Sequence, residues 1–292
     1  MKIGLIDVDS HNFPNLALMK ISAWHKKNGD SVEWWNGLKH YDRVYKAKVF
    51  DDTYTKDNDF VIQADEVIKG GTGYGLSGEL PYDIEHIYPD YELYGIDDTA
   101  YGFLTRGCPR HCSFCIVGDK EGLISHKVAD LKEFWHGQHN IEIMDANLLA
   151  CKNKHNLLSQ LAKCGGVVNF NQGLDVRLLD EEDAKLINQI KTKMVHFAWD
   201  NYEMHTKECL ERAREWLDKD NRSVRVYVLT NYNTNINQDL ERIYTIKSIG
   251  FDPFVMVYDK PHAPQQIRQL QRWCNNKWIF RTVDSFYDYK AN

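Results

Sequence analysis

Basic charge and long apolar runs are both scarce in this sequence of 292 residues. Acidic residues outnumber lysine and arginine by 42 to 36, so the net charge is −6 and bulk attraction to nucleic acid is not expected. No apolar run approaches the length of a membrane span, and Met1 leads directly into a strand-like stretch rather than a signal peptide. We therefore expect a cytoplasmic protein without a membrane partner.

Cysteine is sparse except in one short stretch. Four of the seven cysteines are scattered and are interpreted as buried or incidental thiols: Cys151, Cys164, Cys209 and Cys274. The other three, Cys108, Cys112 and Cys115, lie within eight residues. No second group of cysteines follows them.

Residues 1–98 alternate strand and helix signals. Apolar runs predict strands over residues 2–9, 31–35, 43–50 and 65–75, and apolar positions at helical spacing predict a helix over 15–29. This order favours a small, parallel, Rossmann-like α/β domain. The tyrosine-rich residues 80–98 are interpreted as an irregular connector.

Residues 99–280 contain six strand–helix repeats. The strands are expected at 100–107, 141–145, 167–173, 194–200, 224–231 and 253–259, and the helices at 126–137, 153–163, 180–191, 203–218, 236–249 and 263–277. Near-continuous apolar strands indicate burial on both faces. The repeats predict a partial (β/α)6 TIM-like barrel, followed by a C-terminal tail at 281–292. In such folds the chemistry lies at the carboxyl ends of the strands, where polar residues gather in this sequence.

The three clustered thiols indicate a metal centre, because soft thiolates select zinc or iron–sulfur clusters. A structural zinc ion requires four ligands, which His111 or His126 could complete. However, no second cysteine pair exists, and the group follows the first barrel strand, where catalysis is expected. Three ligands on a 4Fe-4S cluster would leave one iron open to a small molecule.

The spacing Cys108-x3-Cys112-x2-Cys115, with Phe114 before the last cysteine, resembles the signature of the radical S-adenosylmethionine (SAM) superfamily. The resemblance covers roughly residues 100–280. It implies a 4Fe-4S cluster held by these cysteines, SAM bound at the open iron, and a 5′-deoxyadenosyl radical that abstracts hydrogen from a substrate. It also implies an external electron donor such as flavodoxin or ferredoxin. The substrate is expected to be a small molecule rather than a nucleic acid.

The resemblance further implies SAM contacts at the strand ends. The amino group would be approached from the second strand, the carboxylate from the third, the ribose from the fourth and the adenine from the fifth. The candidates are Asp145 and Asn147 for the amino group, and Gln172 and Arg177 for the carboxylate. For the ribose the candidate is Asp200. For the adenine they are Thr230 and Asn231, with Phe114 packed beside it. For Arg177 an ion pair at the start of a helix is an equally good interpretation.

The N-terminal segment resembles a cobalamin-binding domain. Asp9 and His11 match its Asp-x-His pattern, Pro14 stands where a glycine is usual, and residues 70–75 resemble its glycine loop. The segment is short for such a domain, so we interpret it as trimmed, and cobalamin binding is possible but doubtful. For His11, a turn or helix-capping role is favoured over cobalt ligation.

Three alternatives remain open at the level of the sequence. A bound cobalamin would favour a radical SAM methyltransferase. A zinc-clipped nucleotide-binding module would use the glycine-rich loops without catalysis. A radical SAM enzyme acting on RNA is disfavoured by the acidic charge. Iron with sulfide, as opposed to zinc, separates the enzyme from the binding module.

Overall fold

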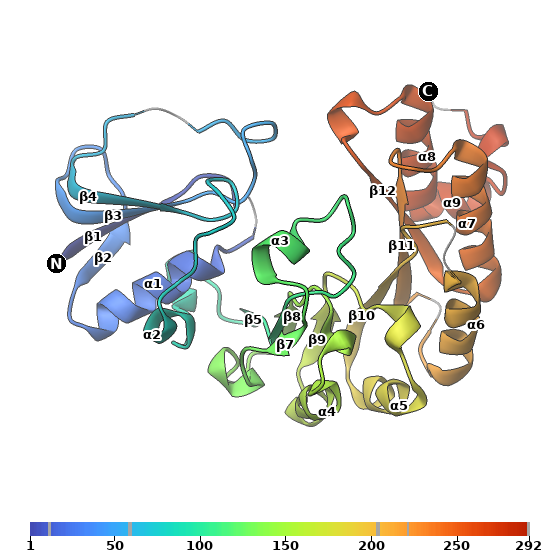
Figure 1. Ribbon diagram of the computed structural model, residues 1–292, viewed down its shortest axis with the longest axis horizontal. Helices are drawn as coiled ribbons and strands as arrows, with labels where there is room; N and C mark the ends of the chain where they lie inside the picture. Colours follow the sequence, from blue (N-terminus) through green and yellow to red (C-terminus); the bar gives the residue numbers. More distant parts are fainter. Residues whose placement is uncertain (11–12, 58–59, 203–204, 221, 291–292) are drawn as a thin grey trace.

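A computed structural model describes residues 1–10, 13–57, 60–202, 205–220 and 222–290, and it contains two parallel β-sheets (Figure 1). A four-stranded sheet is built from the N-terminal part of the chain, and a six-stranded sheet follows it. Each sheet has its own cluster of buried apolar side chains. The mixed α/β character expected from the sequence is therefore confirmed.

The smaller sheet has the strand order β2-β1-β3-β4, and all of its pairs are parallel. Its strands are β1 (Lys2–Asp7), β2 (Ser31–Trp34), β3 (Tyr41–Ala47) and β4 (Ala64–Gly70). Helix α1 (Leu16–Lys27) begins at Asn15, whose side chain accepts a hydrogen bond from the backbone N–H of Leu18 at 3.2 Å. Leu18 and Ile21 of α1 then bury their side chains against Ile3 and Leu5 of β1.

Two glycines after β4 lie where the backbone packs too closely for a side chain. A Cβ at Gly71 would lie 2.3 Å from the carbonyl oxygen of Lys48, and one at Gly73 would lie 2.3 Å from that of Phe50. Asp9 is buried and accepts hydrogen bonds from the backbone N–H groups of Val49 and Phe50, both at 2.8 Å. Close packing around residues 48–50 thus accounts for the glycines and for Asp9. His11, the candidate cobalt ligand, lies outside the described residues.

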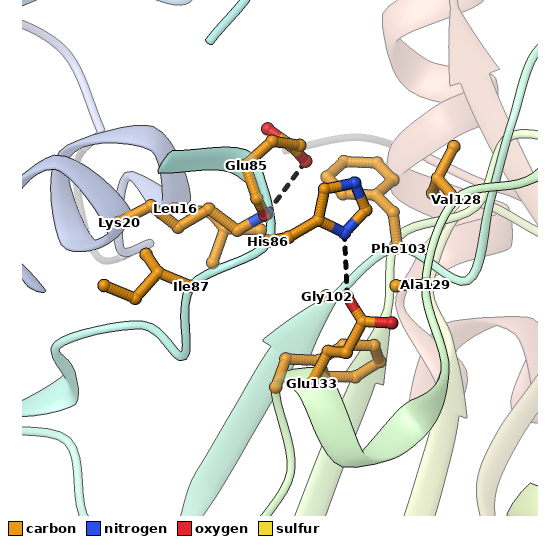
Figure 2. Close-up of a pocket in the computed structure, with 11 residues that line it drawn as sticks. Leu16, Lys20, Glu85, His86, Ile87, Gly102, Phe103, Val128, Ala129 and Glu133 are labelled. Carbon is orange, nitrogen blue, oxygen red and sulfur yellow. Dashed lines mark hydrogen bonds and ion pairs between the residues drawn. The ribbon is translucent and has the colours of Figure 1, made fainter. Parts of the chain in front are cut away.

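The connector between the sheets contains α2 (Tyr82–Glu85) and the 3-10 turn η1 (Tyr91–Tyr94). The buried Tyr91 donates its hydroxyl to the carbonyl oxygen of Phe134 at 2.7 Å. Figure 2 shows a small pocket at which Lys20 pairs with Glu85 at 2.8 Å and His86 pairs with Glu133 at 2.9 Å. The Lys20–Glu85 pair joins the connector to α1, and the His86–Glu133 pair joins it to the part of the chain that contains the larger sheet.

The larger sheet has its strands in sequential order, and every neighbouring pair is parallel. The strands are β5 (Thr99–Gly102), β8 (Asn140–Ile143), β9 (Val167–Phe170), β10 (Thr192–Ala198), β11 (Val224–Thr230) and β12 (Asp252–Val257). The connecting helices are α4 (Lys154–Cys164), α5 (Glu181–Gln189), α6 (Thr206–Trp216), α7 (Ile236–Ile249) and α8 (Gln265–Asn275). The helices line one side of the sheet in Figure 1. A strand forms at each of the six predicted places, but the one expected over 100–107 ends at Gly102.

The helix expected over residues 126–137 is wrong. The chain forms β7 (His126–Lys127), which pairs antiparallel with β6 (Thr105–Arg106), and then the single 3-10 turn η2 (Leu131–Glu133). A capping box between Asp130 and Glu133 closes that turn, and the pairing with β6 holds its N-terminal side in an extended conformation. The apolar spacing that suggested a helix instead buries Leu131 and Phe134 from irregular backbone.

The C-terminal residues pack onto α8. Helix α9 (Lys277–Thr282) and the 3-10 turn η6 (Phe286–Asp288) bring Phe280 and Phe286 against the buried Trp273, with ring centroids 4.8 and 5.7 Å from it. The described part of the expected tail at 281–292 therefore contributes to the core of the larger sheet. Across the described residues, no helix combines the length and apolar character that a membrane span requires.

The environment of His196 on β10 leads to a prediction about how stability depends on pH. It is buried, its Nδ1 lies 3.0 Å from the carbonyl oxygen of Phe170, and its ring stacks on Tyr227. Burial lowers the pKa of His196 from 6.5 to about 4. The unfolded chain therefore binds more protons between these values, and stability is lost as the pH falls through this window. We expect His196 to remove about 2 kcal/mol of the free energy of unfolding between pH 7 and pH 5.

Urea unfolding at the two pH values tests this expectation in the native chain and in His196→Gln. The variant should lose less stability on acidification than the native chain does. Equal losses in the two proteins would contradict the assignment.

Candidate functional site

The cysteine-bearing segment, residues 103–125, leaves the larger sheet after β5 and ends at β7, which pairs with β6 of the same segment outside that sheet. Gly107 has φ of +87°, and a Cβ there would lie 2.2 Å from the carbonyl oxygen of Ile124, so glycine is required where the two arms of the segment meet. The backbone N–H of Cys108 donates to the carbonyl oxygen of Gly122 at 3.1 Å. All three clustered cysteines are half-buried free thiols. The segment also contains the short helix α3 (Val117–Glu121) and lies beyond the strands in Figure 1.

Asp145 follows β8 and holds the start of the cysteine segment. Its carboxylate accepts hydrogen bonds from the backbone N–H groups of Leu104 and Thr105, at 2.8 and 2.7 Å, and from the Thr105 hydroxyl at 2.6 Å. Burial raises the pKa of Asp145 from 3.8 to about 7, although these three donors favour the ionised form. Both carboxylate oxygens are thus engaged within the chain. The SAM contact expected of Asp145 stays a prediction.

Asn147 reaches a cysteine directly. Its side chain is buried, and Nδ2 donates to Sγ of Cys108 at 3.4 Å. Its Oδ1 is also buried and has no hydrogen-bond partner among the described residues. The Ser125 hydroxyl donates to its carbonyl oxygen at 2.9 Å, which ties the return arm of the segment to the same residue. An amide with one end on a cysteine and the other free is suited to contact a ligand there.

Asp175 joins the cysteine segment to the end of β9. It accepts from Nε of Arg110 at 2.5 Å and from Nε of Arg177 at 2.7 Å. The two guanidinium groups hold the pKa of Asp175 below its ordinary value, against the effect of burial. The ion pair that was one interpretation of Arg177 is therefore present. The Arg177 guanidinium also interacts electrostatically with Cys112 and Asp200.

The far side of the segment meets the ends of β11 and β12. The Tyr232 hydroxyl donates to the Ser113 hydroxyl at 2.7 Å, and the Phe114 ring packs edge-on against Tyr232 with centroids 5.5 Å apart. Tyr258 packs against the other side of Tyr232 at 4.8 Å. Phe114, Tyr232 and Tyr258 therefore form an aromatic group beside the cysteine segment.

Asp200 lies at the end of β10. Burial raises its pKa from 3.8 to about 6, while Arg242 and Arg177 oppose the shift. The fully buried Arg242 donates to the carbonyl oxygens of Trp199, Asp200 and Leu229, which fixes the ends of β10 and β11. Burial also raises the pKa of the Cys112 thiol, with further contributions from Asp200 and the other two cysteines.

The remaining candidates differ in position. Gln172 is exposed at the end of β9. Thr230 is fully buried and donates to the carbonyl oxygen of Met256 at 3.2 Å. Asn231 has φ of +62° and donates through Nδ2 to the carbonyl oxygen of Tyr258 at 2.8 Å. The last two thus shape the ends of β11 and β12.

Sequence reasoning missed Arg110, Ser113 and Asp175, which dock the segment, and it did not predict that Tyr232 contacts Ser113. Arg110 lies between two of the cysteines and Asp175 lies two residues before Arg177, so their charges were visible. Their pairing was not, because 65 residues separate them in the chain.

The three cysteine sulfurs do not all lie within 4.8 Å of one another. Among the described residues, the group of three potential ligands with all ligand atoms within 4.8 Å is His155, Asp180 and Asp183. A zinc ion with Zn–S bonds of about 2.3 Å would bring its thiolates within about 4 Å of one another. At the His155 group, the Lys154 ammonium already contacts Asp180 and Asp183 at 2.9 and 2.5 Å, so the chain supplies its own cation there.

No protein-family model matches the sequence, and no curated protein matches it either.

Proposed function

We propose that this chain is a radical SAM enzyme that holds a 4Fe-4S cluster through Cys108, Cys112 and Cys115. One observation carries the proposal: the three-cysteine segment is docked on the carboxyl ends of the parallel strands of the larger sheet. Asp145, Asp175 and Tyr232, which follow three different strands, each contact the segment. Catalytic groups of repeated βα folds gather at this edge of a sheet.

The donor set fits such a cluster. The three thiols are free, and Cys112 is influenced electrostatically by the other two, so all three lie close enough together to serve one metal centre. When bound, the cluster and SAM would supply a 5′-deoxyadenosyl radical that abstracts hydrogen from a small-molecule substrate, after reduction by a donor such as flavodoxin or ferredoxin.

The chain's own residues would place SAM. Asn147 offers a buried acceptor beside Cys108, and Arg177 offers positive charge for a carboxylate. Asp200 offers an acceptor for hydroxyl groups, and Phe114 with Tyr232 offers an aromatic surface for a base. Gln172, Thr230 and Asn231 belong to the proposal through their positions at the strand ends.

The proposal includes a partial (β/α)6 barrel for the larger sheet and a trimmed cobalamin-type domain for the smaller one. Sequential parallel strands with helices along one side support the barrel. The role proposed for the smaller domain is to cover the site, because Lys120 of α3 donates to the carbonyl oxygens of Leu76 and Gly78, at 2.7 and 2.6 Å. A cobalamin-dependent methyltransferase and a zinc-clipped nucleotide-binding module are the competing functions.

Anaerobic purification and cluster reconstitution test the proposal. We expect four irons with sulfide per chain, and 5′-deoxyadenosine on addition of dithionite and SAM, detected by mass spectrometry with and without added cobalamin. One zinc and no iron would favour the binding module instead. A stoichiometric corrinoid spectrum would move the reaction to methyl transfer.

A further inference from the structure

The side chain of Asn147 is buried against Cys108 and serves no other described group. Its Nδ2 lies 3.4 Å from the Cys108 sulfur, and its buried Oδ1 has no hydrogen-bond partner among the described residues. An amide retained for the fold would be expected to use both of its ends, because an unpaired buried polar atom is costly.

The backbone holds this amide in place independently of its side chain. The Ser125 hydroxyl donates to the Asn147 carbonyl oxygen at 2.9 Å, and the 3-10 turn η3 (Leu148–Ala150) follows at once. Leu148 and Leu149 are buried in the core of the larger sheet. The side chain is therefore aimed at Cys108 from an anchored position.

We propose that Asn147 sets the reduction potential of the cluster by donating a hydrogen bond from Nδ2 to the sulfur of Cys108. This inference rests on the proposed function and adds to it a residue that tunes the electron-transfer step. A metal-bound cysteine is a thiolate that only accepts hydrogen bonds, so the donor end of the amide must face it.

The direction of the effect follows from charge. The reduced cluster carries one more negative charge than the oxidised cluster, so a donor on a ligand sulfur stabilises the reduced form more strongly. Removing the donor should therefore make the potential more negative. An exposed-surface substitution of the same type should leave the potential unchanged.

The experiment compares three reconstituted full-length proteins: the native chain, Asn147→Leu, and Asn153→Leu as the matched control. Asn153 is exposed, and its side chain makes no capping hydrogen bond at the start of α4. Potentials are measured by anaerobic redox titration monitored by electron paramagnetic resonance. We expect a more negative potential in Asn147→Leu and the native value in Asn153→Leu.

A second variant covers the case in which Asn147→Leu does not assemble a cluster. Asn147→Val is smaller than leucine and also has no hydrogen-bond donor, so its potential should also be more negative. Electron–nuclear double resonance on the reduced protein should show an exchangeable proton coupling that is lost in either variant.

An intact cluster with the native potential, or with the coupling retained, would overturn this inference and leave the proposed function standing. A native chain that assembles no 4Fe-4S cluster would instead overturn the proposed function, and this inference with it.

Discussion

Replacing Cys108, Cys112 or Cys115 with alanine is expected to abolish cluster assembly and all cleavage of SAM. The three thiolates are the whole set of protein ligands in the proposal, so each variant leaves two. Because loss of a residue that merely supports a ligand costs about 10- to 100-fold in metal affinity or activity, loss of a ligand itself should reduce 5′-deoxyadenosine formation by more than about 100-fold. Iron and sulfide analysis with mass spectrometry measures both effects.

Cys164→Ala is the matched control for these variants. Cys164 is also a half-buried free thiol, but it is the last residue of α4, and its thiol donates a hydrogen bond to the carbonyl oxygen of Leu161 at 3.1 Å. This control should assemble the cluster normally. Iron retained at the native level in all three cysteine variants would refute the assignment.

Replacing Asp145 with alanine should release the cysteine segment and destabilise the chain. The change leaves two buried backbone N–H groups, of Leu104 and Thr105, and the Thr105 hydroxyl without their acceptor. Each unsatisfied buried donor costs about 1–3 kcal/mol, and partial access of water should reduce the sum to about 3 kcal/mol in the free energy of unfolding. Urea unfolding measures this loss, and iron content reports on the segment.

The conservative variant Asp145→Asn keeps the shape of the side chain and removes its ability to ionise, so it separates the two contributions to stability. It keeps one acceptor oxygen and should retain part of the stability. The native carboxyl has its pKa raised by burial from 3.8 to about 7, so its contribution to stability is present below about pH 4 and is lost as the pH rises to 7. The asparagine variant should lack that dependence.

Another outcome would support a different role for Asp145. If Asp145→Ala keeps its stability and its cluster but binds SAM more weakly, the carboxylate contacts the cofactor, as the resemblance implies. The positioning role would then be refuted.

Most of the strands could be predicted from the sequence because each is a short apolar run. Burial on both faces was wrong for β5, β8 and β9, in which fully buried residues alternate with partly buried ones. The strand at 224–231, for example, matches β11 within one residue at its C-terminal end. The predicted helix over 236–249 coincides with α7, which has an Asn235 cap and the C-terminal Gly250. Local signals were sufficient for these elements.

The segment between β5 and β8 could not be predicted in the same way. Its apolar residues have helical spacing around Leu131 and Phe134, but pairing of β7 with β6 prevents a helix from starting at 126. That pairing depends on the cysteine segment folding back on itself at Gly107. Such a contact is non-local, so periodicity does not reveal it.

The sequence by itself determined the α/β class, the positions of the strands and the three closely spaced thiols, because each depends on neighbouring residues. Only the tertiary structure decided that Asp145 holds the backbone of the cysteine segment, that Asn147 faces Cys108, and that Asp175 pairs with Arg110. These contacts join residues 39 to 65 positions apart. They form because parallel strands bring their carboxyl ends to one edge of the sheet, where side chains from distant parts of the chain meet.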